Sequence, residues 1–435
     1  MAGEWALTTL GDVTDVLTGF PFKSSSFSED SDDVKLLRGD NVAQGSLRWD
    51  NAKRWPNAAQ SDLDSYRLLE GDLILAMDRP WIEAGLKFAV VRPQDLPSLL
   101  VQRVARLRAR VGVDQRFLGY VIASRSFTDY ILGVQTGTAV PHISAGQIRA
   151  FSFKLPAAAD QKAIGELLGS LDDKIQLNRR IGETLEDMAL TLFKNWFVDF
   201  GPVRAKAEGR VTGLSAEMSP LFPEGFGADG LPEGWVKRPL LQHARLISGG
   251  TPKTDEPAYW NGAVSWASAK DVSQCPDRLL IGTERSITQR GLVESATRIV
   301  PALSTVVVAR GATTGRHCLF GREMAMNQTC YALSSLNETP FWLTCAFAHL
   351  VDELVQGAHG SVFDTITTTT LGAAHVIDGG QALMLAFEAS VQPLYQRILG
   401  LIEEATTLRT LRDTLLPKLI SGELRIKDAE EAVAA

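Results

Sequence analysis

Two long segments of the chain carry apolar residues mostly at intervals of three and four positions, the spacing of an amphipathic helix. In the first segment the apolar positions are Ile164, Leu168, Leu171, Ile175, Ile181, Leu185, Met188 and Leu192. In the second segment they are Phe387, Val391, Leu394, Ile398, Leu401, Leu408, Leu411 and Leu415. Such intervals are the seam pattern of a coiled coil, so each segment predicts one long helix with a single apolar face.

The two predicted helices share one register. Four pairs of apolar positions, 164 and 387, 171 and 394, 185 and 408, and 192 and 415, are each separated by 223 residues. The shared register extends over roughly 28 residues, or about 42 Å of helix. One such helix cannot bury its apolar face alone, so we expect the two to cover each other as an antiparallel coiled coil. Asn178 stands at the seam position that matches Leu401, where a polar group either fixes the register or lies at a solvated edge.

The segments outside the helices repeat as well. Residues 3–5 are echoed by residues 233–235, and residues 17–23 by residues 247–253. Two further pairs follow in the same order, residues 72–76 with 305–309 and residues 137–143 with 360–366. We therefore expect an α+β fold with a pseudo-twofold internal repeat, in which two mixed α/β domains are linked by the two long helices.

The expected organisation has six parts. They are a first globular domain (1–157), a first spacer helix (158–200), a linker (201–232), a second globular domain (233–380), a second spacer helix (381–425) and a C-terminal tail (426–435). The linker is assigned to the stretch that is rich in Gly and Pro.

The charge of the chain changes the picture only when it is divided along the sequence. The 435 residues are 45% hydrophobic and carry a net charge of −7, which is unusual for a protein that binds nucleic acid. Residues 85–154, however, contain 10 Lys and Arg against 3 Asp and Glu, and residues 237–322 contain 12 against 6. Two basic stretches in an acidic chain are either phosphate-facing patches or ordinary solvated faces.

The chain resembles a cytoplasmic protein in its other features. It has no apolar run long enough to cross a membrane, and residues 1–12 do not form a signal peptide. Its four cysteines, Cys275, Cys318, Cys330 and Cys345, form no CxxC pair, which favours reduced structural thiols and no metal site.

No pattern of catalytic residues is recognisable. The phosphate loop with its Gly-Lys-Ser/Thr ending, the dinucleotide fingerprint, the Asn/Asp-Pro-Pro-Tyr tetrapeptide of amino-methyltransferases, H-E-x-x-H and G-x-S-x-G are all missing from the sequence. We therefore expect no catalytic residues and no cofactor on this chain. An enzyme with an unrecognised site and a coiled-coil adaptor that never touches DNA remain as alternatives.

Loops that follow predicted strands have a composition suited to DNA. Residues 310–316, Arg-Gly-Ala-Thr-Thr-Gly-Arg, follow the strand at 305–309, and residues 77–81 hold the corresponding place in the first half. Glycines let the backbone approach a phosphate, and arginines fork onto phosphate or guanine edges. The candidate DNA-binding residues are Lys23, Arg38, Arg79 and Trp81 in the first half, and Lys253, Trp266, Lys270, Arg310, Thr313 and Arg316 in the second. The alternative is that these are ordinary strand-end loops, with Trp266 in the core.

An aromatic run ends the first helix. Its members are Phe193, Trp196, Phe197 and Phe200. These side chains either pack against the linker and the next domain or form a docking surface for a partner protein.

The sequence resembles the specificity subunits of type I restriction–modification systems. The resemblance is carried by residues 193–206, by residues 247–253 together with Tyr259-Trp260-Asn261-Gly262, and by residues 415–424. With the duplicated domain-plus-helix plan it covers nearly the whole chain. The first half departs from the Gly-Gly-Thr-Pro form of residues 249–252, having Gly-Phe-Pro-Phe at 19–22, so the two halves should present different recognition surfaces.

This resemblance implies a function without catalysis. In that family the globular domains are target-recognition domains that bind double-stranded DNA. Two modification subunits, which bind S-adenosylmethionine and methylate adenine N6, attach to the specificity subunit. Two restriction subunits, which use ATP and Mg²⁺ for translocation and cleavage, then join. The localisation implied is the cytoplasm of a prokaryotic cell.

Overall fold

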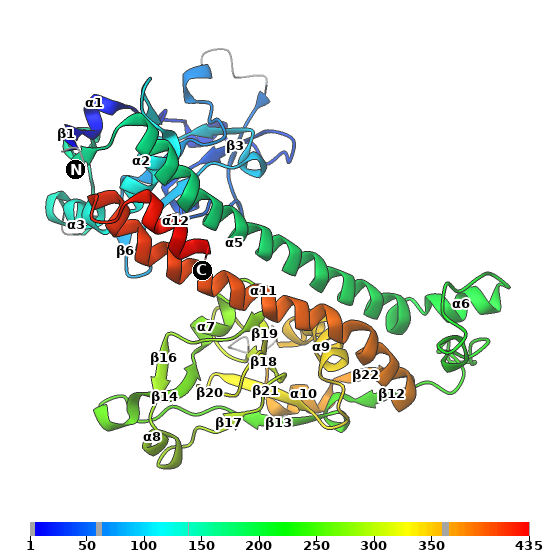
Figure 1. The fold of residues 1–435 in the computed structure, drawn as a ribbon. Helices are drawn as coiled ribbons and strands as arrows, with labels where there is room; N and C mark the ends of the chain where they lie inside the picture. The colour runs from blue at the N-terminus through cyan, green and yellow to red at the C-terminus, as the bar shows by residue number, and fades with distance from the viewer. Residues whose placement is uncertain (1–4, 58–62, 138, 359–364, 435) are drawn as a thin grey trace. The chain divides into compact units, whose positions relative to one another are not determined.

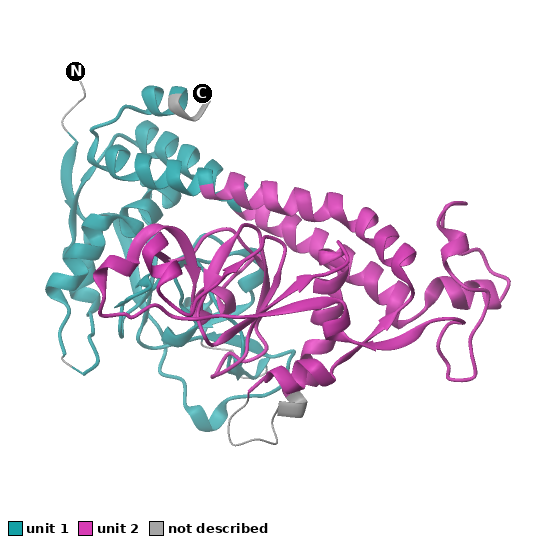
Figure 2. Ribbon diagram, turned by 90° about the horizontal axis from the view of Figure 1, so that it is seen from below, with its two compact units in different colours: residues 1–175, 407–435 teal, residues 176–406 magenta. Residues whose placement is uncertain are grey.

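The computed structural model describes residues 5–57, 63–137, 139–358 and 365–434 of the chain. The chain divides into two compact units, residues 1–175 with 407–435 and residues 176–406 (Figure 2). Two long helices, α5 (Ala158–Phe193) and α11 (Gln381–Ser421), contribute residues to both units. The predicted α+β class with two long helices is confirmed (Figure 1).

The first unit is built on an antiparallel sheet of four strands. In spatial order these strands are β2 (Thr14–Thr18), β10 (Val104–Ala109), β5 (Leu73–Ala76) and β8 (Phe88–Val90). Beside it, β3 (Val34–Leu37) pairs in parallel with β9 (Ser98–Leu100) and antiparallel with β4 (Arg54–Trp55). The remaining strands are β1 (Ala6–Thr9) with β11 (Ser152–Leu155), and β6 (Trp81–Ile82) with β7 (Gly85–Leu86). The helices outside α5 and α11 are α1 (Leu10–Val13), α2 (Gln115–Ala123), α3 (Arg125–Val134), α4 (Ala145–Ala150) and α12 (Ile426–Ala434).

The second unit has the same plan, and its central sheet has five strands in place of four. Its central sheet has the order β13 (Ala244–Ser248), β21 (Cys330–Ser335), β18 (Thr305–Val308), β19 (His317–Phe320) and β15 (Leu279–Leu280). A second sheet has the order β16 (Arg285–Ile287), β14 (Trp260–Ala267), β20 (Met324–Met326) and β17 (Ile299–Val300). The strands β12 (Val236–Pro239) and β22 (His375–Asp378) pair separately. The helices are α6 (Gly201–Ala207), α7 (Ala269–Ser273), α8 (Gln289–Val293), α9 (Pro340–Ala358) and α10 (Thr368–Ala373).

The internal repeat predicted from the sequence recurs in the strand order. The run β2-β10-β5-β8 has the same order and antiparallel pairing as β13-β21-β18-β19. The parallel pair β3–β9 likewise corresponds to the parallel pair β14–β20. The central strands β5 and β18 are fully buried, and they are the two strands aligned from their sequences.

Within the second unit, α5 and α11 pack side by side and run antiparallel. The ring of Phe193 lies 5.8 Å from that of Phe387, while fifteen residues earlier Asn178 contacts Leu401. Lower residue numbers on α5 thus lie beside higher residue numbers on α11, which means that the two helices run in opposite directions. Phe387, Val391 and Ile398 are buried in this unit, as the apolar seam predicts.

The seam contains one polar residue and one shift of register. Asn178 is only 1% exposed, and its Nδ2 donates to the Leu401 carbonyl oxygen at 3.4 Å and to Glu404 Oε2 at 2.8 Å. Of the two interpretations of Asn178, the solvated edge is therefore wrong. Met188, expected in the seam, is 53% exposed, whereas the neighbouring Ala189 is fully buried. The apolar face of α5 therefore continues from Leu185 to Ala189 and Phe193 at intervals of four residues. A straight helix has 3.6 residues per turn, so its apolar face drifts relative to a 3.5-residue repeat.

Within the first unit, the opposite ends of the same helices share a core. Ile164, Leu168 and Leu171 of α5 are buried in one cluster with Leu415 and Leu419 of α11. A polar bridge adds to this packing, because Asp172 accepts hydrogen bonds from Tyr120 Oη at 2.6 Å and from Arg412 Nη1 at 2.5 Å.

Two carboxylates, the buried Glu388 and the half-buried Glu186, connect the long helices of the second unit to its globular part. Glu388 of α11 accepts hydrogen bonds from the backbone N–H groups of Phe341 and Trp342 at 3.0–3.1 Å, which caps the N-terminus of α9. Glu186 of α5 lies 3.8 Å from Arg278 Nη1. Burial raises the pKa of Glu186 to about 7, although the Arg278 guanidinium opposes the shift.

Replacing Asn178 tests the role of the polar seam residue. We expect Asn178→Ala to lower the free energy of unfolding by about 1–2 kcal/mol, because two hydrogen bonds are lost and a small cavity opens. Asn178→Leu should restore stability, because it fills the seam with apolar volume. Urea denaturation of the full chain measures both, with the exposed Met188→Ala as the matched control, expected within about 0.5 kcal/mol of the original. Equal stability of Asn178→Ala and the unmodified chain would contradict the assignment.

The raised pKa of Glu186 predicts a pH-dependent stability. The folded state holds the Glu186 proton up to about pH 7, whereas the unfolded chain releases it near 4.5, so this group destabilises the fold as the pH rises between these values. Glu186→Gln cannot ionise, so its free energy of unfolding relative to the unmodified chain should rise by about 1–3 kcal/mol between pH 5 and pH 8. Denaturation at the two pH values measures this. The exposed Glu183→Gln on the same helix should show no such rise, and a flat difference for Glu186→Gln would refute the prediction.

Candidate nucleic-acid interface

In the first unit, the loop after β5 forms hydrogen bonds with Arg103 and with the segment Pro141–His142. Asp78 accepts hydrogen bonds from Arg103 Nη1 at 3.0 Å and lies 2.6 Å from His142 Nδ1. The backbone N–H of Arg79 donates to the Pro141 carbonyl at 2.6 Å, and its φ of 45° turns the chain sharply. This hydrogen bond holds the backbone of Arg79 in place, and the Arg79 side chain is exposed.

Three of the four candidates in the first unit gather at this loop. Trp81 and Ile82 of the β6–β7 hairpin are 38% and 39% exposed. Lys87 joins this hairpin to the turn that carries Arg38, because its Nζ donates to the Gly39 carbonyl and its backbone N–H to the Pro80 carbonyl. Arg38, Arg79 and Trp81 thus belong to one surface. Lys23 precedes the turn Ser24–Ser26, and its exposed side chain has no ion-pair partner within the described part of the chain.

In the second unit, the loop after β18 is a turn stabilised by hydrogen bonds between its own residues and with the end of the strand. Thr314 donates through both its N–H and its hydroxyl to the Gly311 carbonyl, and the Gly315 N–H donates to the Val308 carbonyl. Gly315 has a φ of 89°, and a Cβ there would lie 2.4 Å from Val355, so glycine is required. The turn leaves Arg310, Thr313 and Arg316 exposed.

The two loops occupy equivalent places. The Ile143 N–H donates to the Met77 carbonyl at 2.9 Å, and the Ile366 N–H donates to the Ala309 carbonyl at 2.9 Å. Residues 359–364, which form most of the second-half match to residues 137–143, lie outside the described residues. The placement of the loops is thus duplicated, while the side chains that they expose differ.

The other candidates of the second unit surround a pair of tryptophans. Trp266 is 4% exposed, its indole Nε1 donates to the Gly250 carbonyl at 3.0 Å, and its ring meets that of Trp260 edge-on at 5.2 Å. Trp266 therefore supports the Gly-Gly-Thr-Pro-Lys segment, as its alternative core role implies. Lys253 is exposed, and Lys270 forms an ion pair of 2.7 Å with Glu284. Arg285, whose guanidinium carbon lies 3.6 Å from the ring centroid of Trp260, is not among the residues named from the sequence, because only the strand pairing brings the two side chains together.

Most of the basic stretch at residues 85–154 is engaged inside the first unit. Arg106 donates to Asp15 at 2.6 Å and is 4% exposed, and Arg108 donates to Asp72 at 2.8 Å. At least eight of its cations bond within the unit, either to a carboxylate (Arg103, Arg106, Arg108, Arg116 and Arg125) or to a backbone carbonyl (Lys87, Arg110 and Arg149). The excess of Lys and Arg in residues 85–154 therefore does not mean that these side chains form a surface patch available to DNA.

Comparison with known proteins decides the family. The model of the type I restriction modification DNA specificity domain matches residues 2–187 and 232–374, most of the chain. The chain belongs to this family. The HindI specificity subunit of Haemophilus influenzae is 26% identical over 481 residues, covering 97% of this chain and 100% of that protein. The MjaIX specificity subunit of Methanocaldococcus jannaschii is 24% identical over 321 residues, covering 73% and 71%.

A solved structure has the same fold. The type I restriction-modification S subunit of M. genitalium matches with a TM-score of 0.53 at 14% identity, covering 96% of both chains. The chain is thus a specificity subunit of a type I restriction–modification system, the non-catalytic component that recognises the DNA target.

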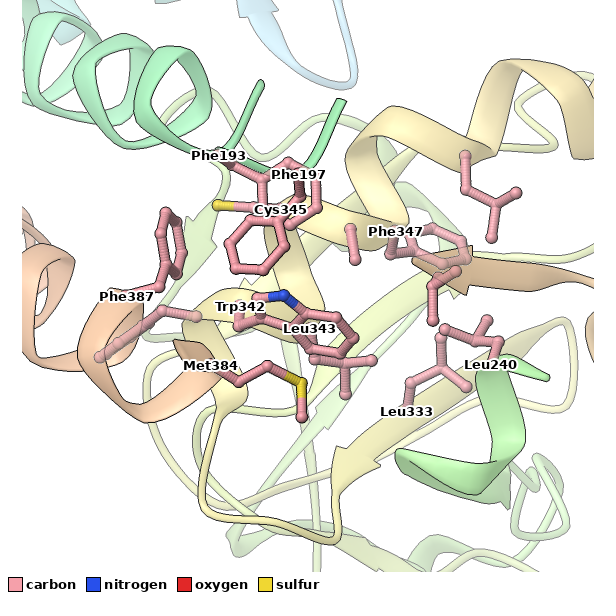
Figure 3. Close-up of a cluster of buried hydrophobic side chains, with 14 of the residues drawn as sticks. Phe193, Phe197, Leu240, Leu333, Trp342, Leu343, Cys345, Phe347, Met384 and Phe387 are labelled. Carbon is pink, nitrogen blue, oxygen red and sulfur yellow. The ribbon is translucent and has the colours of Figure 1, made fainter. Parts of the chain in front are cut away.

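In this specificity subunit the aromatic run is a core element. Phe193, Trp196, Phe197 and Phe200 are between 1% and 7% exposed. Phe193 and Phe197 pack against Phe387 and Trp342, as Figure 3 shows. A π-helical turn at Lys194–Val198 and a left-handed Phe200 bring the aromatic residues to one side. The placement agrees with the packing alternative, and a docking role for these four residues stays a prediction.

The specificity subunit shows little other chemistry in its described residues. No group of three or more His, Cys, Asp and Glu side chains that could hold a metal is found there. Burial raises the pKa of Cys330 and of Cys345 to about 12, which keeps both as thiols at neutral pH. No described helix is long and apolar enough to span a membrane.

Substitutions in the loop after β18 test its contact with DNA. We expect Arg310→Ala and Arg316→Ala each to weaken binding by about 1–3 kcal/mol and to leave the base preference of the first domain unchanged. Fluorescence anisotropy with target duplexes measures the affinity. Arg298→Ala is the matched control, because Arg298 is exposed but donates to the backbone of its own turn. Unaltered affinity and base preference in both variants would remove these residues from the interface.

Proposed function

We propose that this specificity subunit reads a bipartite, asymmetric DNA target, one half with each globular domain. The observation that carries the proposal is the repeated strand order with unlike loops at equivalent places. A symmetric dimer with identical surfaces reads a palindrome. Here the first domain exposes Arg79 and the Trp81 hairpin, whereas the second exposes Arg310, Thr313 and Arg316, so the half-sites should differ in sequence.

The proposed recognition domains are residues 1–157 and 233–380, and the proposed spacer helices are residues 158–200 and 381–425. The linker at 201–232 and the tail at 426–435 complete these boundaries. The DNA-binding set is the ten residues named from the sequence. In nine of them the side chain is exposed, which supports direct contact, whereas the buried Trp266 would act by supporting its loop.

The proposed partners follow the family. Two modification subunits and two restriction subunits assemble on this chain, and S-adenosylmethionine, ATP and Mg²⁺ bind to those subunits and not to this one. The chain would work in the cytoplasm of a prokaryotic cell, where its DNA target lies. Both the HindI and the MjaIX relatives are specificity subunits of type I restriction enzymes, which supports this assembly.

The long helices are proposed to set the distance between the half-sites. Helix α5 has 36 residues and α11 has 41, and each carries residues of both units. Phosphate contacts would position each domain on the duplex, while fewer side chains read base edges. The unread spacer of the target would then depend on helix length and not on the identity of the loops.

A matched insertion in both helices tests this proposal. Seven residues added to each helix preserve the heptad seam and lengthen it by about 10 Å, which corresponds to about three base pairs of duplex. We expect methylome sequencing of cells that carry the variant and its modification subunit to show unchanged half-sites and a longer spacer. The unmodified chain in the same cells supplies the reference motif.

Two outcomes would count against the proposal. A variant that methylates different half-site bases would refute the role of the helices as spacers. The absence of any new methylated motif with the unmodified chain, together with no salt-dependent DNA binding, would refute DNA reading itself.

A further inference from the structure

An exposed arginine of the second unit is stacked on a buried aromatic pair. The guanidinium carbon of Arg285 lies 3.6 Å from the ring centroid of Trp260 and 5.6 Å from that of Trp266. Both indoles are buried, with 8% and 4% exposure, while Arg285 is exposed at the start of β16. A guanidinium stacked on an indole keeps its N–H groups directed outward in its own plane.

The local sequence explains how the two residues meet. Arg285 lies directly opposite Trp266 in the antiparallel β14–β16 pair. The pairing then shifts, so that both Val264 and Trp260 lie opposite Ile287, and Asn261 takes a φ of 60° within the shift. Gly262 is required there because a Cβ would lie 2.4 Å from Thr288. The Tyr-Trp-Asn-Gly segment thus forms a bulge that brings Trp260 beneath Arg285.

The aromatic pair also fixes the neighbouring loop. The indole Nε1 of Trp260 donates to the Lys253 carbonyl at 3.0 Å, and that of Trp266 donates to the Gly250 carbonyl at 3.0 Å. Arg285 and the loop that carries the exposed Lys253 therefore rest on the same indole. A side chain held in this way loses less conformational entropy on binding than a free arginine.

Arg285 differs from Lys270 and Arg290 in having no acidic partner among the described residues. Lys270 pairs with Glu284 at 2.7 Å, and Arg290 pairs with Glu294 at 3.0 Å. No described carboxylate lies within ion-pair distance of Arg285. In the first unit, Arg54 on the equivalent strand β4 donates to the Asp33 carbonyl at 2.7 Å and is partly buried. The free stacked arginine is therefore a feature of the second domain.

We propose that Arg285 reads a guanine in the DNA half-site of the second domain, with Trp260 and Trp266 as its positioning residues. Paired N–H donors of a planar guanidinium match the O6 and N7 acceptors of guanine in the major groove. Prior stacking fixes the plane of this fork, and the missing counter-ion leaves the donors free for the base. The inference rests on the proposed DNA-reading function and names a base-reading residue within it.

Arg285→Ala and Arg285→Lys test the proposal in the full chain with its modification subunit. Competition binding against duplexes with all four base pairs at each position of the target measures base preference. We expect both variants to lose about 10- to 100-fold of the preference for guanine at one position of the second half-site. Lysine cannot present two N–H donors in a fork, so it should not rescue the preference. The first half-site should be read unchanged.

Arg290→Ala is the matched control, because Arg290 is an exposed arginine of the same region that is already paired with Glu294. It should leave base preference unaltered. A uniform loss of affinity across all sequences in Arg285→Ala, with rescue by lysine and a shallower salt dependence, would identify a phosphate contact and overturn the proposal. Unchanged binding in Arg285→Ala would overturn it as well. Failure of the unmodified chain to bind DNA would instead refute the proposed function.

Discussion

The mutual burial of two apolar helix faces is the constraint on which the rest of the structure depends. The side chains along the seams of α5 and α11 are mostly apolar. Full burial of one Leu, Ile or Phe side chain contributes about 1.5–3 kcal/mol to folding. Each helix therefore requires the other, and the globular parts must be joined to this pair. Asn178 is the polar exception. Its hydrogen bonds to Leu401 and Glu404 form in one alignment of the helices only, so it adds specificity where apolar contacts alone would tolerate a slip.

The helix pair also determines how the aromatic run is used. Phe193 and Phe197 reach the ring of Phe387 on α11 and that of Trp342 on α9. Glu388, one residue beyond Phe387, caps the first turn of α9. The globular part of the second unit is thus attached to the helices by an aromatic cluster and a buried carboxylate.

The parts of the structure that could be predicted from the sequence are those that depend on the spacing of apolar residues and on the internal repeat. The seam positions, the equivalence of β5 with β18 and the antiparallel helix pair followed from intervals and offsets alone. The shift from Met188 to Ala189 did not, because it depends on how a straight helix drifts against its partner. The aromatic run left two interpretations open, since a sequence does not distinguish an exposed aromatic side chain from one covered by a distant helix. Arg285 was missed for a related reason: its contact with Trp260 requires a bulge whose register no local pattern reveals.

The distribution of charge shows why a chain with a net charge of −7 is compatible with DNA reading. Electrostatic attraction to a phosphate depends on charges within about a Debye length, or roughly 8 Å at physiological salt, so the net charge of distant residues has little influence. In the first unit, Arg106 and Arg108 neutralise Asp15 and Asp72 within the fold. Arg79, Arg285, Arg310 and Arg316 are different, because their side chains are exposed and no described carboxylate pairs with them. A few cations without a described carboxylate partner give a local positive field together with hydrogen-bond geometry.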